Sequence, residues 1–390
     1  MHRLHVVALP HLAVSKRNNA CAYTQKVLNF CKMMDGHDVT LYAPEPNLTE
    51  DPVTDEEMNW LGGTNVKFCP TVTKFDRLSL LGAYNRTKEL PTLPFVPSHP
   101  LWMLANSRTI SELNYRLRPK DFICLIGGTC QKPIADAFPR RDVKVVEFGI
   151  GYTGVFAPYK VFESYAHQAR CLSMANKDPN GGWSDAVIPN YYDPGDFPLG
   201  NGQGDYFLFV GRVIKRKGLA ILQHLQQALG IKIVVAGQGA TVLDAGSGLR
   251  SSDGAEFPGL TYHGYADVAT RARLMAGAKA ILTPTYYLEP FGGVAVEAQM
   301  CGTPAITTDW GAFPETVEHG KTGFRCRTLS HFIRACQEVE HLDRSYIRER
   351  AIRKYSLEAV AKRYNDYFDT LADTGWNSLR PRMSLEFLND

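Results

Sequence analysis

Two carboxylates stand eight positions apart in the sequence E-P-F-G-G-V-A-V-E, which begins at Glu289 and ends at Glu297. Pro290 ends the strand or loop that carries Glu289, because its ring fixes φ and removes a backbone donor. A helix is predicted to begin near Gly293, so Glu297 lies in its second turn. Glu289 can then accept hydrogen bonds from sugar hydroxyls, and Glu297 from a ribose diol. A structural alternative stays open, since the helix macrodipole also favours acids near a helix start.

The start of this helix also predicts an anion site. The first amides of a helix have no intrahelical partner and point at an incoming negative group. Here those amides belong to Phe291, Gly292 and Gly293, and the glycines allow a ligand to approach the backbone closely. Phosphate is the expected ligand.

A basic loop follows a predicted strand at Tyr206–Val210. Its sequence, G-R-V-I-K-R-K-G, runs from Gly211 to Gly218. The planar fork of Arg212 and the compact ammonium of Lys217 could neutralise a diphosphate leaving group as it departs. A solvated charged loop is the alternative. The spacing G-x-x-x-x-G-K-[ST] is absent, which argues against a Walker-type ATPase.

Two further strand ends carry candidate ligand contacts. The turn A-G-Q-G places Gly237 and Gly239 where a nucleobase could approach the backbone, although an ordinary turn explains them equally well. His263 and Tyr265 end the next strand. A backbone amide there could read a base edge and Tyr265 could stack on the base, while a core histidine at an ordinary strand end is the alternative.

The elements that must position these residues follow a repeating order. A strand at His5–Leu9, a helix at about Tyr23–Met34 and the strand-like G-H-D-V-T-L-Y-A predict a right-handed βαβ unit. Buried strands are also predicted at Asp121–Ile126 and Val143–Phe148, each followed by glycines at the carboxyl end where ligands bind. Leu90–Pro100 has too many prolines for regular structure and predicts an irregular surface segment.

A second series follows the turn-rich stretch Asn190–Gly204, which is the predicted linker. In order, its expected elements are the strand Tyr206–Val210, the helix Leu219–Leu229, the strand Lys232–Ala236, a strand near Leu260–His263, the helix Val268–Ala276, the strand Ala280–Pro284, the helix from Gly293 and the strand Thr303–Thr307. A long amphipathic helix is predicted at Leu357–Leu371. The order favours two doubly wound α/β domains that face each other across a cleft.

Composition restricts the class of protein. The 390 residues exceed one ordinary core, 44% are hydrophobic, and the net charge of +3 does not suggest an electrostatic nucleic-acid binder. Nine cysteines without a C-x-x-C pair indicate reduced, intracellular thiols. The first apolar run is too short for a signal-peptide core, and no stretch approaches a membrane span. We therefore expect a cytoplasmic protein for which membrane contact is not indicated.

Order and spacing together resemble a known family. The chain contains, in this order, a strand followed by G-R-x-x-x-x-K-G, a strand with G-x-G, then H-G, E-P-F-G-G-x-x-x-E, C-G-T-P-A-I-T-T-D-W-G and H-G-K-T-G-F. This order is similar to that of the donor-binding half of glycosyltransferase family 4, the retaining group 1 enzymes of GT-B fold. The resemblance covers Tyr206 to Arg327 closely and the whole chain more loosely.

The resemblance implies a role for each motif residue. Arg212 and Lys217 would stabilise the donor diphosphate, and Glu289 would contact the transferred sugar. Glu297 would hold the ribose hydroxyls. Further donor contacts would come from Gly211, Gly237, Gly239, His263, Tyr265 and the backbone of Phe291, Gly292 and Gly293. The implied reaction retains anomeric configuration by front-face attack, without a covalent nucleophile. No metal or other cofactor is expected, since Arg212, Lys217 and helix amides replace a cation and no Asp-x-Asp cluster follows a likely strand end.

The acceptor side departs from the family pattern. Many members have a glycine pair after the first strand, whereas this chain reads S-K-R-N-N-A over Ser15–Ala20. Members also often carry a histidine after a later strand, where this chain has Glu147. The acceptor-side candidates are therefore Glu147, Gly149, Gly151 and Tyr152, with His11, His99 and His167 as weaker ones.

These observations predict a GT-B enzyme with three parts. Residues 1–195 form a Rossmann-like acceptor domain, residues 196–355 a Rossmann-like donor domain, and residues 356–390 a helical segment that packs back on the first. The expected reaction transfers a hexose-like sugar from a nucleoside diphosphate sugar to an acceptor hydroxyl. Alternatives are a non-catalytic nucleotide-sugar or carbohydrate-binding protein and a phosphorylase-like GT-B enzyme that uses a sugar phosphate. A dinucleotide oxidoreductase is disfavoured because no G-x-G-x-x-G follows the first strand.

Overall fold

The fold is described from a computed structural model, which covers residues 1–18, 21–46, 66–82, 93–139, 142–243 and 248–373. The chain divides into two compact units. The first unit contains the described residues up to Pro189 and those from Val360 onward, and the second contains Asn190–Ala359. The domain boundaries at 195/196 and 355/356 remain predictions.

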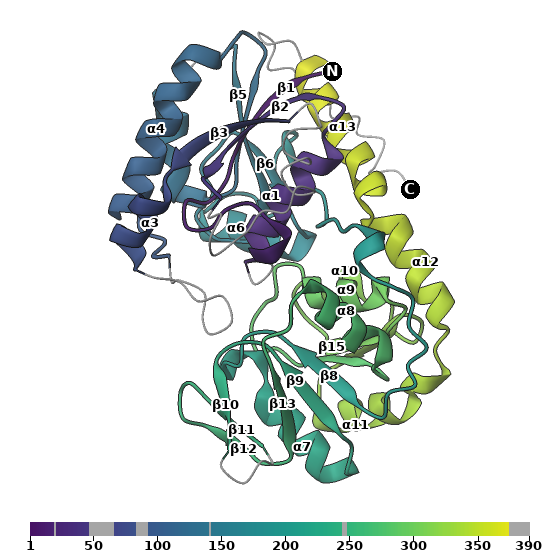
Figure 1. The fold of residues 1–390 in the computed structure, drawn as a ribbon. Helices are drawn as coiled ribbons and strands as arrows, with labels where there is room; N and C mark the ends of the chain where they lie inside the picture. The colour runs from purple at the N-terminus through teal and green to yellow at the C-terminus, as the bar shows by residue number, and fades with distance from the viewer. Residues whose placement is uncertain (19–20, 47–65, 83–92, 140–141, 244–247, 374–390) are drawn as a thin grey trace. The chain divides into compact units, whose positions relative to one another are not determined.

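The first unit is built on a parallel sheet of seven strands in the order β3-β2-β1-β4-β5-β6-β7 (Figure 1). The strands are β1 (Arg3–Val7), β2 (Asp38–Pro44), β3 (Val66–Val72), β4 (Phe122–Leu125), β5 (Lys144–Ile150), β6 (Tyr159–Phe162) and β7 (Asp185–Val187). The strands β4 and β5 are buried along their whole length, as expected for a sheet that helices cover on both faces.

Helices cover both faces of this sheet. On one face, Leu113 of α4 (Pro100–Arg116) and Ile134 of α5 (Lys132–Ala137) pack against Val7, Ile123 and Leu125. The helix α3 (Lys74–Leu81) lies beside α4, and α6 (Tyr165–Met174) lies against β6. The opposite face is covered by α1 (Ala22–Met33) and the last helix, α13 (Leu357–Asp373).

An aromatic cluster joins α13 to the first unit. The ring of Phe368 lies 5.0 Å from Phe122 and 6.4 Å from Phe30, and Tyr364 meets Phe30 edge-on at 5.1 Å. All of these rings are fully buried. The last described helix of the chain therefore completes the core of the unit that contains the first strand.

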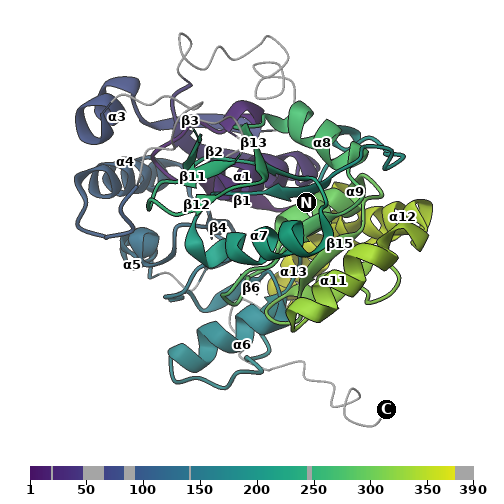
Figure 2. The ribbon, with the colours of Figure 1, turned by 90° about the horizontal axis from the view of Figure 1, so that it is seen from below.

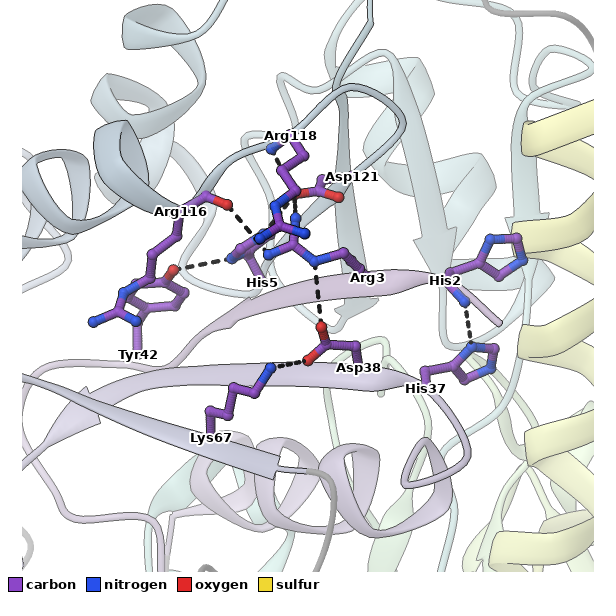
Figure 3. Close-up of polar contacts among 10 residues, drawn as sticks. All are labelled: His2, Arg3, His5, His37, Asp38, Tyr42, Lys67, Arg116, Arg118 and Asp121. Carbon is purple, nitrogen blue, oxygen red and sulfur yellow. Dashed lines mark hydrogen bonds and ion pairs between the residues drawn. The ribbon is translucent and has the colours of Figure 1, made fainter.

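A polar network closes the amino-terminal edge of the same sheet (Figure 3). Arg3 lies between two carboxylates, with guanidinium nitrogens 2.8 Å from Asp121 and 3.3 Å from Asp38. The buried imidazole of His5 contacts both the Tyr42 hydroxyl at 2.9 Å and the Asp121 carboxylate at 3.0 Å. These contacts tie β1, β2 and the start of β4 together at the edge opposite the carboxyl ends of the strands.

The second unit has a six-stranded parallel sheet in the order β13-β9-β8-β14-β15-β16. Its strands are β8 (Phe207–Val210), β9 (Ile233–Ala236), β13 (Leu260–Gly264), β14 (Ile281–Thr283), β15 (Ala305–Thr308) and β16 (Gly323–Cys326). The central strands β8 and β14 pair directly, so the strand order reverses between them. Ligands bind at such reversal points in open parallel sheets.

Two helical layers flank this sheet. On one face, α7 (Leu219–Leu229) and α11 (Leu329–Glu338) lie side by side (Figure 2) and bury Leu222 and Phe332. The other face carries α8 (Val268–Gly277), α9 (Gly293–Met300) and α12 (Arg344–Tyr355), which bury Met275, Val296 and Ala351. The short helix α10 is Phe313–Thr316.

In the second unit, one crossover has no helix among its described residues. Between the parallel neighbours β9 and β13 the chain forms a small antiparallel sheet of β10 (Ala240–Val242), β11 (Leu249–Ser251) and β12 (Glu256–Phe257). A helix is the usual connection between parallel strands. The turn after β11 folds back on the strand end, because the Ser252 amide donates to the Gly239 carbonyl at 2.9 Å.

The predicted doubly wound architecture is confirmed, and each predicted strand and helix with stated bounds lies within two residues of an observed element. Several observed elements had no prediction. They are β3, β6, β7, β10 to β12, β16, α3 to α6 and α10 to α12. The described part of Leu90–Pro100 has no regular structure before α4 begins at Pro100. Every described helix is too short or too polar to span a bilayer.

Candidate functional site

Glycine turns end the neighbouring strands β8, β9 and β13. The Gly211 amide donates to the Ala236 carbonyl at 3.0 Å, and the Gly237 amide donates to the Gly264 carbonyl at 2.8 Å. A Cβ on Gly237 would overlap the Gly211 carbonyl oxygen, so only glycine fits there. The predicted donor-binding glycines, Gly211 and Gly237, therefore lie together, and close backbone packing already accounts for Gly237.

An ion pair joins the basic loop to the Glu289 turn. The Lys217 ammonium lies 3.2 Å from each oxygen of the Glu289 carboxylate. Both side chains are largely shielded, with 20% and 14% of their surfaces exposed. Lys217 belongs to the 3₁₀ turn Lys215–Lys217 that follows β8, 72 positions before Glu289. The structure thus brings two predicted site residues into direct contact.

Tyr287 lies beneath this pair. Its ring centre is 5.0 Å from the Lys217 ammonium and 4.9 Å from the Arg216 guanidinium carbon. Burial and the neighbouring Glu289 carboxylate raise the pKa of the Tyr287 hydroxyl, and the charges of Arg216 and Arg212 oppose that shift. Arg212 is exposed and close enough to interact electrostatically with this ring. Positive charge is therefore concentrated around Tyr287 and Glu289.

A turn after β15 fixes the backbone of Glu289. The Ala312 amide donates to the Glu289 carbonyl at 3.0 Å, and the Trp310 indole N–H donates to the Tyr287 carbonyl at 3.2 Å. A Cβ on Gly311 would lie 2.7 Å from the Glu289 nitrogen. The W-G-A sequence at positions 310–312 therefore fixes the backbone that carries the Glu289 carboxylate.

The start of α9 has no side-chain cap. Gly292 is the N-cap residue in the left-handed region at φ +77°, and within the described residues no side-chain hydrogen bond caps the helix. A Cβ on Gly292 would lie 2.5 Å from the Phe313 ring, and one on Gly293 would lie 2.7 Å from the Tyr192 hydroxyl oxygen. Phe291 is buried and packs edge-on against Tyr355 at 5.8 Å. The predicted helix start is present, and its amides are left without a capping side chain.

Glu297 pairs with an arginine that sequence analysis did not single out. The Arg271 Nε atom of α8 lies 3.1 Å from the Glu297 Oε2 atom, and 14% and 13% of the two side chains are exposed. Burial raises the pKa of Glu297, and the charge of Arg271 opposes that shift. Both atoms are shielded from solvent, and their alignment does not satisfy hydrogen-bond geometry. The Oε2 atom therefore retains its capacity to accept a hydrogen bond.

The end of β13 is irregular. The pairing of β13 with β9 shifts register between Tyr262 and Gly264, which leaves His263 as the bulged residue, and its side chain is exposed. The hydroxyl of Tyr262 donates to the Gly237 carbonyl at 2.7 Å. Tyr265 follows the strand and is half-buried. A core role for His263, which the sequence left open, is wrong.

In the first unit, Glu147 has partners for both carboxylate oxygens. Oε1 accepts from the Tyr152 hydroxyl at 3.1 Å, and Oε2 accepts from the amides of Phe156 and Ala157, both at 2.8 Å. Burial raises the pKa of Glu147, and these bonds oppose that shift. The carboxylate therefore closes the loop after β5, which is the structural alternative to an acceptor role.

The loop glycines of this unit lie beside a buried ion pair. The Lys26 ammonium of α1 contacts the Glu163 carboxylate at the end of β6 and lies 3.4 Å from the Gly149 carbonyl. A Cβ on Gly151 would lie 2.6 Å from a Glu163 oxygen. Lys26 and Glu163 had no prediction, and their separation of 137 positions left no local pattern to find them.

The three weaker histidine candidates have different surroundings. His99 caps α4, because its Nδ1 atom accepts from the Leu101 amide at 3.3 Å. Burial lowers the pKa of His167 to about 4, and its Nε2 atom lies 2.9 Å from the Tyr152 carbonyl. His11 is buried. In the loop after β1, Asn19 and Ala20 lie outside the described residues.

Sequence reasoning missed the residues that hold the predicted ones in place. These are Tyr192, Arg216, Tyr262, Arg271, Tyr287 and the turn Trp310–Ala312. Arg216 had a usable signal because it lies in the basic loop beside Lys217, and Trp310 and Gly311 had one because they belong to the motif C-G-T-P-A-I-T-T-D-W-G. No group of three metal-ligating side chains occurs within the described residues.

The second unit matches a known family. Residues 204–340 match the family model of glycosyl transferases group 1. The chain is 30% identical over 216 residues to a phosphatidyl-myo-inositol mannosyltransferase of Mycobacterium tuberculosis, across 49% of this chain and 56% of that protein. It is 37% identical over 127 residues to a D-inositol 3-phosphate glycosyltransferase of Mycobacterium bovis, across 30% and 25% of the two chains. The chain thus spans about half the length of the first relative and a quarter of the second.

Solved structures share the whole fold. A sucrose-phosphate synthase from Thermosynechococcus elongatus has a TM-score of 0.64 at 16% identity, across 96% of this chain and 100% of that one. Anabaena HepE, solved in complex with UDP, has a TM-score of 0.62 at 14% identity, across 96% and 100%. The chain therefore has the GT-B fold of these structures, and residues 204–340 of its second unit match the group 1 glycosyl transferases.

Proposed function

We propose that this protein is a retaining glycosyltransferase that moves a sugar from a nucleoside diphosphate sugar to an acceptor hydroxyl. The observation that carries the proposal is the uncapped start of α9, which lies in sequence between two paired carboxylates. Glu289 is held by Lys217, and Glu297 faces Arg271. The match to group 1 glycosyl transferases over residues 204–340 includes all of these residues.

Each part of this arrangement suits one part of the donor. The open amides of α9 suit phosphate oxygens, because their partial positive charge is not used by a side chain. Glu289 suits the hydroxyls of the transferred sugar, and Glu297 suits the ribose diol. Arg212 and Lys217 supply the positive charge that a diphosphate between two carboxylates requires.

In the proposed reaction the bond from the anomeric carbon to the leaving phosphate oxygen breaks. The acceptor oxygen bonds to the same face of that carbon, and its proton passes to the departing phosphate. Negative charge therefore develops on the diphosphate, where Lys217, Arg212 and the α9 amides would stabilise it.

We further propose that the reaction needs no metal ion, because cationic side chains and helix amides provide the positive charge. Equal turnover in EDTA and in Mg²⁺ is the expected result. Loss of turnover in EDTA that Mg²⁺ restores would contradict this part of the proposal. The free, buried cysteines fit a reducing compartment, and we propose the cytoplasm.

A thermal-shift screen over UDP, GDP, ADP and dTDP sugars tests the donor class. A bound donor raises the melting temperature by mass action, and a base preference should stand out among the four series. Release of free nucleoside diphosphate during incubation with the preferred donor then tests catalysis. We expect the Lys217→Ala variant to bind the donor and to release the diphosphate far more slowly.

Two outcomes would favour the alternative functions. Tight donor binding without transfer or hydrolysis would favour a nucleotide-sugar or carbohydrate-binding protein. Turnover of a sugar phosphate with phosphate release, unaffected by free UDP, GDP or ADP, would favour a phosphorylase-like enzyme.

A further inference from the structure

Arg271 points inward from a helix whose other arginine points outward. The helix α8 begins after Asp267, whose carboxylate accepts from the Thr270 amide at 2.8 Å. Arg271 lies in the first turn, and its side chain is directed toward α9. Arg273, two positions further on, is exposed and contacts the Thr270 hydroxyl at 3.2 Å. The same short helix therefore provides a buried arginine and a matched exposed one.

The Nε atom of Arg271 and the Oε2 atom of Glu297 are close, but neither has a hydrogen-bond partner among the described residues. Their 3.1 Å separation places the two charges in direct contact, and both atoms are shielded from solvent. A shielded carboxylate oxygen without a donor carries a desolvation cost that a ligand hydroxyl can remove. The charge of Arg271 therefore holds Glu297, and the Oε2 atom can still accept a hydrogen bond from a ligand.

Glu297 is the negatively charged residue among the titratable groups that surround it. The Tyr192 hydroxyl lies at the start of α9, and burial and the nearby Glu297 charge keep its pKa well above the usual range. The Cys301 thiol at the end of α9 is also buried, and burial and Glu297 raise its pKa. Arg271 supplies the opposite charge from α8. Tyr192 and Cys301 thus stay neutral at physiological pH, and the carboxylate depends on Arg271 for its counter-charge.

We propose that Arg271 is the positioning residue for nucleoside recognition: it holds the Glu297 carboxylate in place to accept hydrogen bonds from the vicinal diol of the donor's ribose. The inference rests on the proposed nucleotide-sugar function. It assigns the preference for ribose over deoxyribose to a pair of residues on α8 and α9. Arg271 itself acts through Glu297 and does not contact the reacting atoms.

Calorimetry with UDP and its 2′,3′-dideoxy analogue tests the inference, with the corresponding GDP and ADP pairs measured in parallel. Hydrogen bonds to a charged group are worth enough for the protein to bind the ribonucleotide about 10- to 100-fold more tightly. Arg271→Met should reduce this ratio toward 1, and Arg271→Lys should restore most of it. Arg273→Met is the control and should leave the ratio unchanged. A full ribose preference in Arg271→Met would overturn the proposal.

The pH dependence separates positioning from general damage to the fold. Without Arg271, burial alone acts on Glu297, so its carboxyl should remain protonated to higher pH. The ribose preference of Arg271→Met should therefore increase with pH more steeply than that of the unaltered protein. A ribose preference of Arg271→Met that falls as the pH rises would overturn the proposal.

A second pair of variants covers the case in which Arg271→Met does not fold. The double variant Arg271→Met with Glu297→Gln removes the uncompensated buried charge and should fold. It should bind UDP as tightly as Glu297→Gln alone, because Arg271 acts only through the carboxylate. Weaker binding by the double variant would overturn the proposal.

The unaltered protein distinguishes failure of this inference from failure of the proposed function. Failure to bind UDP, GDP, ADP and dTDP would overturn the proposed function and this inference together. Binding of a diphosphate with no preference for the diol would leave the proposed function standing and would overturn only the role of Arg271.

Discussion

The contact between Lys217 and Glu289 determines the charge of the turn that precedes α9. An ammonium 3.2 Å from both carboxylate oxygens neutralises Glu289 in the absence of ligand. A bound diphosphate would offer the same ammonium a second anionic partner. The pair can therefore serve both halves of a nucleotide sugar, with Glu289 on the sugar and Lys217 on the phosphate.

We predict that Lys217→Ala lowers turnover by about 10² to 10³, equivalent to about 3–4 kcal/mol of barrier, which is typical for loss of one donor to a developing anion. Single-turnover kinetics at saturating donor measure the effect. Lys215→Ala, an exposed lysine of the same 3₁₀ turn, is the control. Unchanged sugar transfer by Lys217→Ala would exclude the assigned role.

Glu297→Ala should weaken nucleotide binding more than it slows the saturated reaction, because the ribose contact is the same in the ground state and the transition state. Calorimetric Kd values for the nucleoside diphosphate and kcat at saturating donor provide the comparison. Equal affinity of the variant and the unaltered protein would contradict a ribose role for Glu297.

At the scale of elements, the start of α9 depends on the left-handed backbone of Gly292. We predict that Gly292→Ala destabilises the second unit by about 2–3 kcal/mol. Two costs contribute: alanine is strained at a φ of +77°, and its methyl group would overlap the Phe313 ring. It should also weaken donor binding, since the first amides of α9 would shift.

Gly230→Ala is the matched control for this prediction. Gly230 also has positive φ, but a Cβ there meets open space, so only the backbone strain of about 1 kcal/mol should remain. Urea unfolding measures both variants. Equal loss of stability in the two would show that the Phe313 contact does not contribute.

The cap of α3 predicts a pH dependence. Asp76 forms a capping box with Thr73. Its carboxylate also forms an ion pair with Arg108, which lies 32 positions further along the chain. Burial raises the pKa of Asp76, but Arg108 and Thr73 outweigh it and lower the pKa from 3.8 to about 2. Since the folded pKa is depressed, ionised Asp76 stabilises the folded state above about pH 4, and this contribution is lost as pH falls toward 2.

Asp76→Asn should therefore cost about 1–2 kcal/mol at pH 7, and the difference from the unaltered protein should shrink between pH 4 and pH 2. Urea unfolding at several pH values measures it. Asp136→Asn, which removes an exposed pair with Lys132, should change stability by no more than about 0.5 kcal/mol. A difference that does not depend on pH would contradict the role of the Asp76 charge.

At the scale of the whole molecule, the last described helix belongs to the first unit. Phe368 of α13 is fully buried among Phe30 of α1, Phe122 of β4 and Tyr364 of α13 itself. Phe368→Ala should destabilise the first unit by about 3–5 kcal/mol, the usual cost of removing a buried ring. Fluorescence-monitored and circular-dichroism-monitored urea unfolding measure the shift.

The control for Phe368→Ala is Phe75→Ala on α3, whose side chain is 77% exposed. It should change stability by no more than about 0.5 kcal/mol. A similarly small loss in Phe368→Ala would show that α13 contributes little to the core of the first unit.

Periodicity and turn residues predicted most elements of the second unit. The helix Leu219–Leu229 has the predicted bounds, because Gly218 and Gly230 limit it on both sides. The sheet β10–β12 had no prediction, since its strands are two or three residues long and show no readable alternation.

In the first unit, the helix α4 was also missed, although Pro100 at its first turn and the residues after it are typical of a helix.

The sequence by itself determined the parallel α/β class, the helix start at Gly293 and the acids on either side of it, because these depend on local spacing and backbone preference. Only the tertiary structure decided which charges meet. Lys217 reaches Glu289 across 72 positions, and Arg271 reaches Glu297 from another helix. Such pairs depend on how strands and helices pack, and packing brings together residues whose separation along the chain carries no signal.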